Sequence, residues 1–301
     1  MNRRRFLEVL AGAVVVGGLG AAGLLEDDVT LRYKLAEHLG LHPGPDLVLP
    51  SSGARIVEGS FESRSMHGQV SYAYSLPANR GPEAIVISLY GMGGNQLRPF
   101  TALHLPDAAA HVGAPLCIAS AYGGRDNYWH RRANGTDSHA MVVDELVPLL
   151  RKRLGPLPLA LHGWSMGGYG ALLAAERGEQ GSGGNLFRGV AASSPALWTT
   201  AGGAAPGAFD NAQDFYANDV FTAVDALKSL QVRLDCGDED PFYQATRKLS
   251  SLMTWPHEAV FRQWAAHTDG FWRTVAPAQM RFLARACGLR GVEEAVEPGR
   301  R

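Results

Sequence analysis

Short apolar runs, each about the length of a buried strand, alternate along this chain with longer segments of helical character. The run at 84–89 is almost entirely apolar, whereas the run at 69–76 alternates, with Val70, Tyr72 and Tyr74 on one face. Strands and helices that alternate in this way build one mainly parallel sheet covered on both faces by helices. We therefore predict one α/β domain over residues 51–288. Strands are expected at 55–63, 69–76, 84–89, 115–120, 159–162, 190–195 (including its turn), 231–236 and 258–264. Helices are expected at 136–154, 171–176, 220–230 and 271–287, and two further helical segments are expected to end at about 111 and about 253.

Two further segments flank this domain. Residues 26–50 are predicted to be a short helical linker, in which 27–39 can form an amphipathic helix with Leu31, Leu35 and Leu39 on one face. Residues 289–301 are rich in charge, and we predict that they form a disordered tail.

Residues 1–25 have the pattern of an export signal. The sequence Arg3-Arg4-Arg5-Phe6-Leu7 precedes an uncharged run at 9–25, and a charged start before a modestly apolar stretch is typical of such signals. The Arg-Arg-x-Phe-Leu order is similar to a twin-arginine signal. No clean Ala-x-Ala cleavage site follows, so attachment to the membrane through an uncleaved N-terminus is the alternative. We predict export across the cytoplasmic membrane to a secreted, envelope or membrane-anchored location.

Composition narrows the classes of partner. The 301 residues carry a formal net charge of −1 with no basic block, so nucleic acid is not an expected partner. Cys117, Cys236 and Cys287 fit neither a zinc-site spacing nor a dense disulfide framework. Two of them lie in predicted strands, which favours buried, unreactive thiols. We expect neither a metal ion nor an organic cofactor.

The sequence Gly163-x-Ser165-x-Gly167 stands between a predicted strand and a predicted helix, which is the context of a nucleophile elbow. A serine at the tip of such a tight turn holds an unfavourable backbone conformation, and its neighbours must have almost no side chain. The turn exposes the hydroxyl of Ser165. It also places the next backbone N–H, that of Met166, at the start of the helix, where it can face an oxyanion.

Two other turns follow predicted strands and are candidates for the substrate site. The glycine-rich turn Tyr90-Gly91-Met92-Gly93-Gly94 comes where α/β-hydrolases place their second oxyanion donor. The polar and aromatic loop at 122–132 follows the next strand, at the edge where open α/β sheets bind ligands. We predict that Tyr90, Trp129 and Trp164 line the substrate site.

Three groups that suit nucleophilic catalysis come in the chain order of α/β-hydrolases: Ser165, an acid at 238–240, and His267. A serine hydroxyl needs an imidazole to take its proton, and a carboxylate holds that imidazole in the right tautomer. His267 is the histidine that lies between the last predicted strand and the final helix, whereas His162 ends the elbow strand and suits the core.

Three aspartates compete for the role of the acid. Asp235 lies within a predicted strand, so its side chain is committed to the sheet or its edge. Asp238 can cap the next helix. Asp240 precedes Pro241, which favours the first turn of a helix, and this places Asp240 at the N-cap within reach of the loop of His267.

Four segments carry a family resemblance: 163–171 (Gly-Trp-Ser-Met-Gly-Gly-Tyr-Gly-Ala), 144–148 (Asp-Glu-Leu-Val-Pro), 237–242 (Gly-Asp-Glu-Asp-Pro-Phe) and His267 with Phe271-Trp272. Together they are similar to the esterase D group of α/β-hydrolases, which includes S-formylglutathione hydrolases and secreted mycolyltransferases. The resemblance covers about 55–287. It implies a triad of Ser165, Asp240 and His267, with the backbone amides of Met92 and Met166 as oxyanion donors. The predicted export signal distinguishes this chain from the cytosolic members of the group. The chain also lacks an obvious match for the segments with which mycolyltransferases contact trehalose.

The predicted function is that of an exported serine carboxylic-ester hydrolase of the α/β-hydrolase fold, which acts through an acyl-enzyme on a small-molecule or lipid ester. One alternative is an acyltransferase of the mycolyltransferase type, with the same acyl-enzyme and a different acceptor. A second alternative is a non-catalytic envelope protein that keeps the fold for binding.

The export signal can be tested directly. Replacing Arg3 and Arg4 together by lysine is expected to keep the protein in the cytoplasm, because a twin-arginine receptor reads guanidinium geometry as well as charge. Fractionation of cells that express the wild type or the double variant measures this. Unchanged export would point instead to the general secretory route or to a plain membrane anchor.

Overall fold

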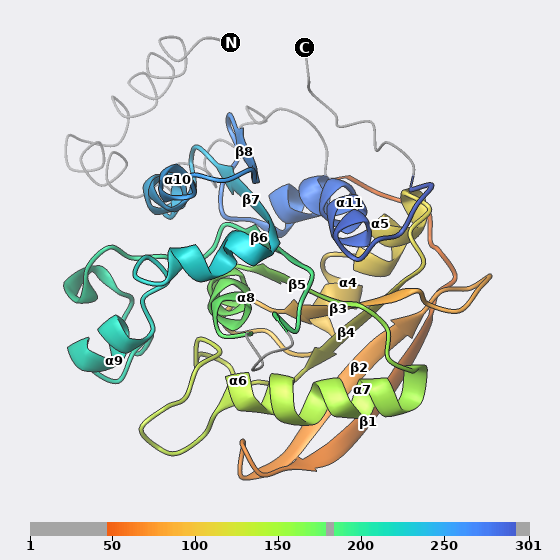
Figure 1. Cartoon of the computed structure of the whole chain (residues 1–301), viewed down its shortest axis with the longest axis horizontal. Helices are drawn as coiled ribbons and strands as arrows, with labels where there is room; N and C mark the ends of the chain where they lie inside the picture. Colours follow the sequence, from red (N-terminus) through yellow and green to blue (C-terminus); the bar gives the residue numbers. More distant parts are fainter. Residues whose placement is uncertain (1–46, 179–183, 293–301) are drawn as a thin grey trace, which may run out of the picture.

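The computed structural model describes residues 47–178 and 184–292. Within these residues an eight-stranded sheet has the order β1-β2-β4-β3-β5-β6-β7-β8 (Figure 1). Neighbouring strands from β4 through β3 to β8 are parallel, whereas β2 pairs antiparallel with both β1 and β4. The predicted, mainly parallel sheet is therefore confirmed. The strands are β1 Arg55–Ser63, β2 Gly68–Leu76, β3 Ala84–Leu89, β4 Leu116–Ala121, β5 Leu159–Trp164, β6 Gly189–Ser193, β7 Gln231–Gly237 and β8 Glu258–Arg262.

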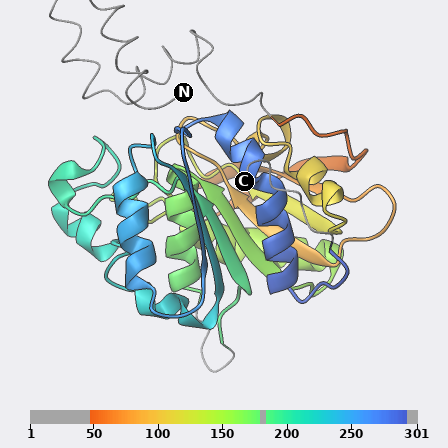
Figure 2. The ribbon, with the colours of Figure 1, turned by 90° about the horizontal axis from the view of Figure 1, so that it is seen from above.

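Helices cover both faces of the sheet (Figure 2). α5 and α11 pack together over one face, where α11 also contacts β5, β6 and β7. α8 packs on the opposite face against β3, β5 and β6. The helical elements are α4 Arg98–Thr101, α5 Leu105–His111, α6 Ser138–Ala140, η1 Met141–Leu146, α7 Val147–Leu154, α8 Met166–Glu176, η3 Ala201–Gly203, α9 Ala212–Ala217, η4 Val224–Ser229, α10 Tyr243–Leu252 and α11 Asp269–Ala286.

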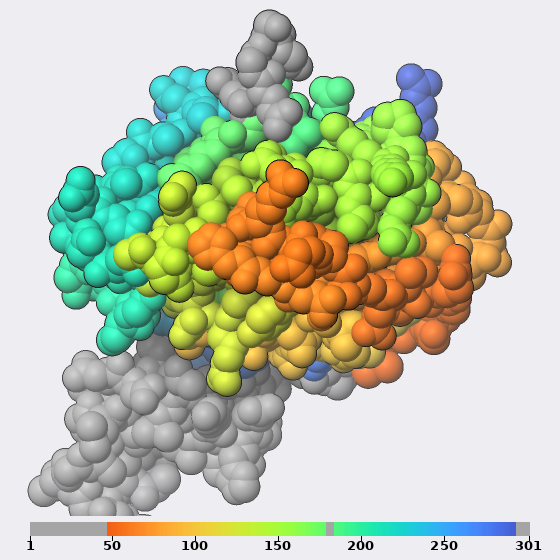
Figure 3. Space-filling view, turned by 90° about the horizontal axis from the view of Figure 1, so that it is seen from below, coloured from red at the N-terminus to blue at the C-terminus, as the bar shows by residue number. Residues whose placement is uncertain are grey.

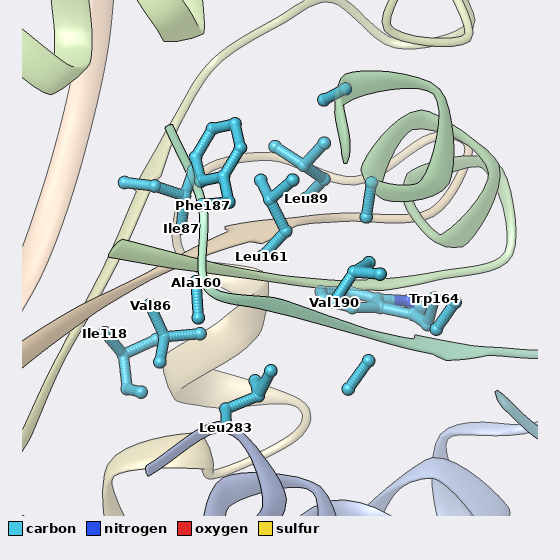
Figure 4. Close-up of a cluster of buried hydrophobic side chains, with 14 of the residues drawn as sticks. Val86, Ile87, Leu89, Ile118, Ala160, Leu161, Trp164, Phe187, Val190 and Leu283 are labelled. Carbon is cyan, nitrogen blue, oxygen red and sulfur yellow. The ribbon is translucent and has the colours of Figure 1, made fainter. Parts of the chain in front are cut away.

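The core is centred on β3, β4, β5 and β6, which are buried along their whole length. Strands that are covered by helices on both faces have nearly continuous apolar sequences. For this reason the apolar run at 84–89 predicted both ends of β3 correctly. Figure 4 shows the two halves of the core: Val86, Ile118 and Ala160 on the side of Leu283 in α11, and Ile87, Leu89, Leu161 and Phe187 on the other side.

The β1–β2 hairpin forms one edge of the sheet and lies at the molecular surface beside α7 (Figure 3, orange and yellow-green). Val70, Tyr72 and Tyr74 are buried, as their alternation predicts. Glu145 fixes the hairpin to the helical segment, because its carboxylate accepts hydrogen bonds from Ser63 Oγ and from backbone N–H groups of the turn.

The helix predicted over 136–154 consists of three pieces, α6, the π-helical turn η1 and α7. Pro148 has no N–H to donate to a carbonyl four residues earlier. The turn before it is wider, and Val147 N–H donates to the carbonyl of Val142, five residues back.

Several predicted boundaries need correction. The helix expected at 220–230 is a 3₁₀ helix over Val224–Ser229. β8 ends at Arg262, because Trp264 has a φ of 61°, which a strand does not adopt. The predicted tail begins later, since Val292 is 8% exposed and packs on the core. The remaining tail at 293–301, the signal at 1–25 and the helix at 27–39 lie outside the described residues.

In the part of the chain that the structure describes, no helix is long and apolar enough to cross a membrane. The three cysteines are buried and free, and the burial of Cys117 and Cys236 agrees with their position in predicted strands. Burial raises the pKa of the Cys117 and Cys287 thiols to about 12, which keeps them protonated and unreactive.

A buried polar network joins four strands to α11, and Gln279 is its centre. Its amide N–H₂ donates to Ser193 Oγ and to Asp235 Oδ2, both at 2.8 Å. Its carbonyl oxygen lies 3.1 Å from His162 Nε2, so this nitrogen carries the imidazole proton. His162 Nδ1 then accepts from Ser88 Oγ at 3.0 Å. His162 is therefore a core residue, as predicted, and burial favours its neutral imidazole by lowering its pKa.

This arrangement predicts a loss of stability in acid. Burial lowers the pKa of His162 from 6.5 to about 4. Between these values the unfolded chain binds a proton that the folded chain excludes, so the free energy of unfolding falls as the pH drops from about 6.5 towards 4. The shift corresponds to a loss of about 3 kcal/mol.

Urea unfolding at pH 7, 5.5 and 4.5 measures this loss. His162→Gln should lose less stability than the wild type over the range, whereas the exposed control His111→Gln should follow the wild type. An equal loss in His162→Gln and the wild type would show that His162 does not carry the effect.

Candidate active site

Ser165 stands at the turn between β5 and α8 with φ 55° and ψ −125°, a strained conformation for a residue with a side chain. The glycines around it allow the turn to close. A Cβ on Gly163 would lie 2.0 Å from the carbonyl oxygen of Gly167, and a Cβ on Gly167 would lie 1.9 Å from that of Leu89. The Gly-x-Ser-x-Gly pattern is therefore a steric requirement of this turn, and it leaves the serine hydroxyl partly exposed.

The strained turn is held by backbone hydrogen bonds to the neighbouring strand end. Ser165 N–H donates to the carbonyl of Ser193 at 3.0 Å, and the Ser165 carbonyl accepts from Ala196 N–H at 3.0 Å. The same carbonyl accepts the Tyr169 N–H of α8 at 3.1 Å. The end of β6 and the first turn of α8 thus fix the backbone of the serine.

His267 connects Ser165 to Asp240. His267 Nε2 lies 2.8 Å from Ser165 Oγ, and His267 Nδ1 lies 2.9 Å from Asp240 Oδ2. The carboxylate can only accept, so Nδ1 carries the proton and Nε2 is free to accept the serine proton. The Asp240 side chain is fully buried, and that of His267 is 25% exposed. The three predicted residues are therefore hydrogen-bonded in sequence, in a geometry suited to activation of the serine.

Asp240 is held by its own turn rather than by the helix start that the sequence suggested. The N-cap of α10 is Phe242, two residues later. Asp240 Oδ1 accepts the Phe242 N–H at 2.9 Å, which leaves Oδ2 for His267. The prediction of an N-cap is wrong because Pro241 and Phe242 form a turn before α10 begins at Tyr243.

The other two aspartates have structural partners. Asp235 is fully buried and receives two hydrogen bonds from Arg233, at 2.8 and 2.9 Å, as its predicted commitment to the sheet requires. Burial raises the pKa of Asp235, while the Arg233 guanidinium opposes that shift. Asp238 does not cap the helix: its Oδ1 accepts the backbone N–H of Trp264 at 2.6 Å, which fixes the segment before His267.

The loop of His267 is built against the end of β7. Gly237 allows a close approach, since a Cβ there would lie 2.0 Å from the carbonyl oxygen of Ala265. Two backbone hydrogen bonds follow, from Asp238 N–H to Arg262 at 2.9 Å and from Glu239 N–H to Ala265 at 3.0 Å.

Two aromatic side chains enclose the imidazole of His267. The Trp272 ring of α11 lies nearly perpendicular to it with the centroids 4.9 Å apart, and the Phe242 ring lies at 5.4 Å. Trp272 Nε1–H donates to Ser194 Oγ at 3.0 Å, which anchors the indole beside the end of β6. Sequence reasoning gave Trp272 and Phe242 no individual role, although both lie in the segments that carry the family resemblance.

A salt bridge across the site had no signal in the sequence. Arg98 in α4 and Asp269 at the start of α11 are 171 positions apart, and their side chains meet at 2.6 Å. The bridge joins the segment after the glycine-rich turn to the segment after His267. Both side chains are more than 30% exposed, so it contributes at most about 1 kcal/mol to stability.

The glycine-rich turn after β3 lies against the nucleophile. A Cβ on Gly91 would lie 3.2 Å from the Cβ of Ser165, a tight contact that would require the neighbouring atoms to shift. Gly93 N–H donates to the carbonyl of Arg125 at 2.7 Å, which holds the turn. The backbone N–H groups of Met92 and Met166, the two predicted oxyanion donors, have no acceptor among the described residues.

The prediction that Tyr90, Trp129 and Trp164 line the substrate site is wrong, because their exposed fractions are 0%, 1% and 2%. They lie beneath the surface and support it. Trp129 Nε1–H donates to the Tyr90 carbonyl at 3.2 Å, and Tyr90 Oη bonds the backbone of Gly123 and Gly124. These contacts join the glycine-rich turn to the loop after β4. Burial raises the pKa of Tyr90 well above its usual value, so its hydroxyl stays protonated.

A serine in a strained strand-to-helix turn, bonded through a histidine to a buried aspartate on a mainly parallel sheet, defines the fold as that of an α/β-hydrolase. The model of the family described as "Putative esterase" matches residues 63–271, and the chain belongs to this esterase family. Among the described residues, no group of three His, Cys, Asp or Glu side chains is placed to hold a metal ion.

Solved structures share the fold across most of the chain. An S-formylglutathione hydrolase from Agrobacterium tumefaciens superimposes with a TM-score of 0.64 and 15% identity, over 81% of this chain and 100% of that chain. A ferulic acid esterase gives 0.62 and 20% identity, over 77% and 98%. MPT51 of Mycobacterium tuberculosis gives 0.58 and 16% identity, over 81% and 99%. The predicted resemblance to the esterase D group is confirmed. No curated protein sequence matches the chain.

The geometry distinguishes the two acids nearest His267. Asp240→Asn should lower kcat by about ten-thousandfold, because an amide at this position favours the wrong imidazole tautomer. Asp238→Asn keeps an oxygen that can accept the Trp264 N–H, so we expect a loss of about tenfold or less, the size of one weakened hydrogen bond. Steady-state kinetics of both variants at neutral pH measure this. An inactive Asp238→Asn protein with an active Asp240→Asn protein would reverse the assignment.

Proposed function

We propose that this protein is an exported serine carboxylic-ester hydrolase that works through an acyl-enzyme on Ser165. The observation that carries the proposal is the hydrogen-bonded series Ser165–His267–Asp240, with distances of 2.8 and 2.9 Å. Membership of the esterase family supports the reaction class. The substrate class is a small-molecule or lipid ester, in line with the ferulic acid esterase among the structures of the same fold.

In the first half of the reaction, Ser165 Oγ attacks the ester carbonyl carbon while His267 Nε2 takes the hydroxyl proton. The carbonyl oxygen becomes an oxyanion, and in this proposal the backbone N–H groups of Met92 and Met166 donate to it. The bond from carbon to the alcohol oxygen then breaks, and His267 gives its proton to that oxygen. The alcohol leaves, and Ser165 carries the acyl group.

In the second half, a water molecule attacks the acyl carbon while His267 takes its proton. The bond to Ser165 Oγ breaks, the proton returns to Oγ, and the carboxylic acid leaves. Asp240 stays ionised throughout and stabilises the imidazolium that forms twice in the cycle. An alcohol in place of this water would give acyl transfer, and we propose hydrolysis because the family is one of esterases.

The proposal of export rests on the N-terminal sequence pattern alone. The three arginines followed by a modestly apolar run support a twin-arginine route, and this segment lies outside the described residues. The proposal places the reaction outside the cytoplasmic membrane.

Ser165→Ala tests the nucleophile. We expect the variant to fold normally and to lose roughly a thousandfold or more in kcat on p-nitrophenyl acetate, since the alanine has no hydroxyl to acylate. The matched control is Ser251→Ala, because Ser251 is exposed at the end of α10. Circular dichroism checks the fold of both variants. Most of the esterase activity remaining in a folded Ser165→Ala protein would end the serine-hydrolase proposal.

A further inference from the structure

A continuous series of apolar side chains runs from His267 to the glycine-rich turn. The Phe242 ring contacts His267 and lies 5.5 Å from the Trp198 ring, which lies 5.5 Å from the Tyr128 ring. Tyr128 Oη in turn approaches Met92 Sδ at 3.9 Å. We name Phe242, Trp198, Tyr128 and Met92 the aromatic arc. The arc connects His267, the proposed general base, to Met92, whose backbone N–H is a proposed oxyanion donor.

Part of the aromatic arc is open to solvent. The Met92 side chain is 63% exposed, and Trp198 and Phe242 are half-buried, whereas Tyr128 is 4% exposed and supports the others. Met92 is among a handful of large apolar residues that the described chain leaves exposed. The groups on this surface are ring carbons, a thioether and one donor, the indole N–H of the half-buried Trp198, because the Tyr128 hydroxyl already points at the Met92 sulfur. Such a surface binds apolar groups in preference to hydroxylated ones.

Ring contacts brace the aromatic arc from behind. Phe209, in the segment that carries α9 and stands out from the body in Figure 1, contacts the Tyr128 and Trp198 rings with centroids 6.3 and 6.1 Å apart. It also stacks on His130, at 5.3 Å. Phe209 therefore holds two rings of the arc, Tyr128 and Trp198, in place.

Polar contacts dock the same segment onto the loop after β4. Arg132 donates twice to Asp210 Oδ1, at 2.9 and 3.2 Å, and His130 Nε2 lies 3.1 Å from Asp214 Oδ2. The segment at 199–219 therefore supports Tyr128 and Trp198, and these two rings have less conformational entropy to lose when a ligand packs on the arc.

The position of the arc indicates that it contacts the alcohol part of the ester rather than the acyl part. In the proposed reaction the carbonyl oxygen points to the N–H groups of Met92 and Met166, and the alcohol oxygen must approach His267 Nε2, which returns its proton. Phe242 packs on His267, and Trp198 continues the surface away from it. The group attached to the alcohol oxygen is therefore the one that reaches these two rings.

The geometry points to an aromatic-alcohol subsite: the aromatic arc binds the alcohol part of the ester and favours alcohols that carry a flat aromatic ring. This inference rests on the proposed serine-hydrolase function and adds the substrate class. Ring-on-ring packing with Trp198 and Phe242 supplies the preference, and a single donor, the Trp198 indole N–H, is too little to satisfy the several hydroxyls of a sugar alcohol.

A set of acetates tests the subsite, because all of them form the same acetyl-enzyme. Benzyl acetate and ethyl acetate have leaving alcohols of similar acidity, so the ratio of their kcat/KM values reports binding of the ring. We expect the wild type to favour benzyl acetate, and Trp198→Ala to lower the ratio by roughly tenfold to a hundredfold, mainly through KM for benzyl acetate. Trp255→Ala is the matched control: it removes a half-buried tryptophan that packs under Lys228 outside the arc, and should leave the ratio unchanged.

A second variant keeps the test informative if Trp198→Ala fails to fold. Met92→Ala shortens an exposed side chain, keeps the backbone N–H, and should lower the same ratio by a few-fold. An unchanged ratio in the folded variants would overturn the subsite. A wild type that prefers an acetylated methyl glucoside to benzyl acetate would overturn the aromatic class.

Two further outcomes separate the inference from the function on which it rests. Ethyl phenylacetate carries its ring on the acyl side, and a Trp198→Ala effect confined to that ester would overturn the assignment to the alcohol. A folded wild type that hydrolyses none of these esters and does not react with a fluorophosphonate would overturn the proposed function itself. Activity on ethyl acetate without any preference for benzyl acetate would overturn the subsite alone.

Discussion

The left-handed backbone of Ser165 is the constraint on which the rest of the site depends. It exists because Gly163 and Gly167 leave space that no other residue would leave, and because β6 and α8 bond the serine backbone on both sides. Once the turn is fixed, the hydroxyl of Ser165 is held at the carboxyl end of β5, within reach of His267. His267 and the glycine-rich turn then need only approach this fixed point from neighbouring strand ends.

The fold supplies that approach through the order of its strands. β5 carries the serine at the middle of the sheet, β3 beside it carries the glycine-rich turn, and β7 and β8 lead to Asp240 and His267. The buried network around Gln279 ties Ser88, His162, Ser193 and Asp235 together one layer below these strand ends. A fully bonded polar network in a core specifies one arrangement of its strands, because each unpaired member would carry a desolvation cost.

Features that depend on local pattern could be predicted from the sequence. The bounds of β3, the elbow at Ser165, and the order of Ser165, an acid at 238–240 and His267 follow from apolar periodicity, turn chemistry and position in the chain. The choice of Asp240 rested on the family resemblance, because the N-cap position that also favoured it is wrong. Features that depend on packing could not be predicted from the sequence. Tyr90, Trp129 and Trp164 stand beside site residues in the sequence, yet their size and apolar surface place them beneath the site. The salt bridge of Arg98 with Asp269 has no local signal at all, because only the folded sheet brings the two residues together.

The central claim is that Ser165 is a nucleophile activated by His267. Intact-mass measurement after treatment with a fluorophosphonate, followed by peptide mapping, tests it most directly, because the probe bonds covalently to an activated serine. The account predicts one adduct per chain, located on Ser165, and a strongly slowed reaction in a folded His267→Ala variant. Absence of any adduct on the folded wild type, or an adduct on another serine with Ser165 unmodified, would contradict it.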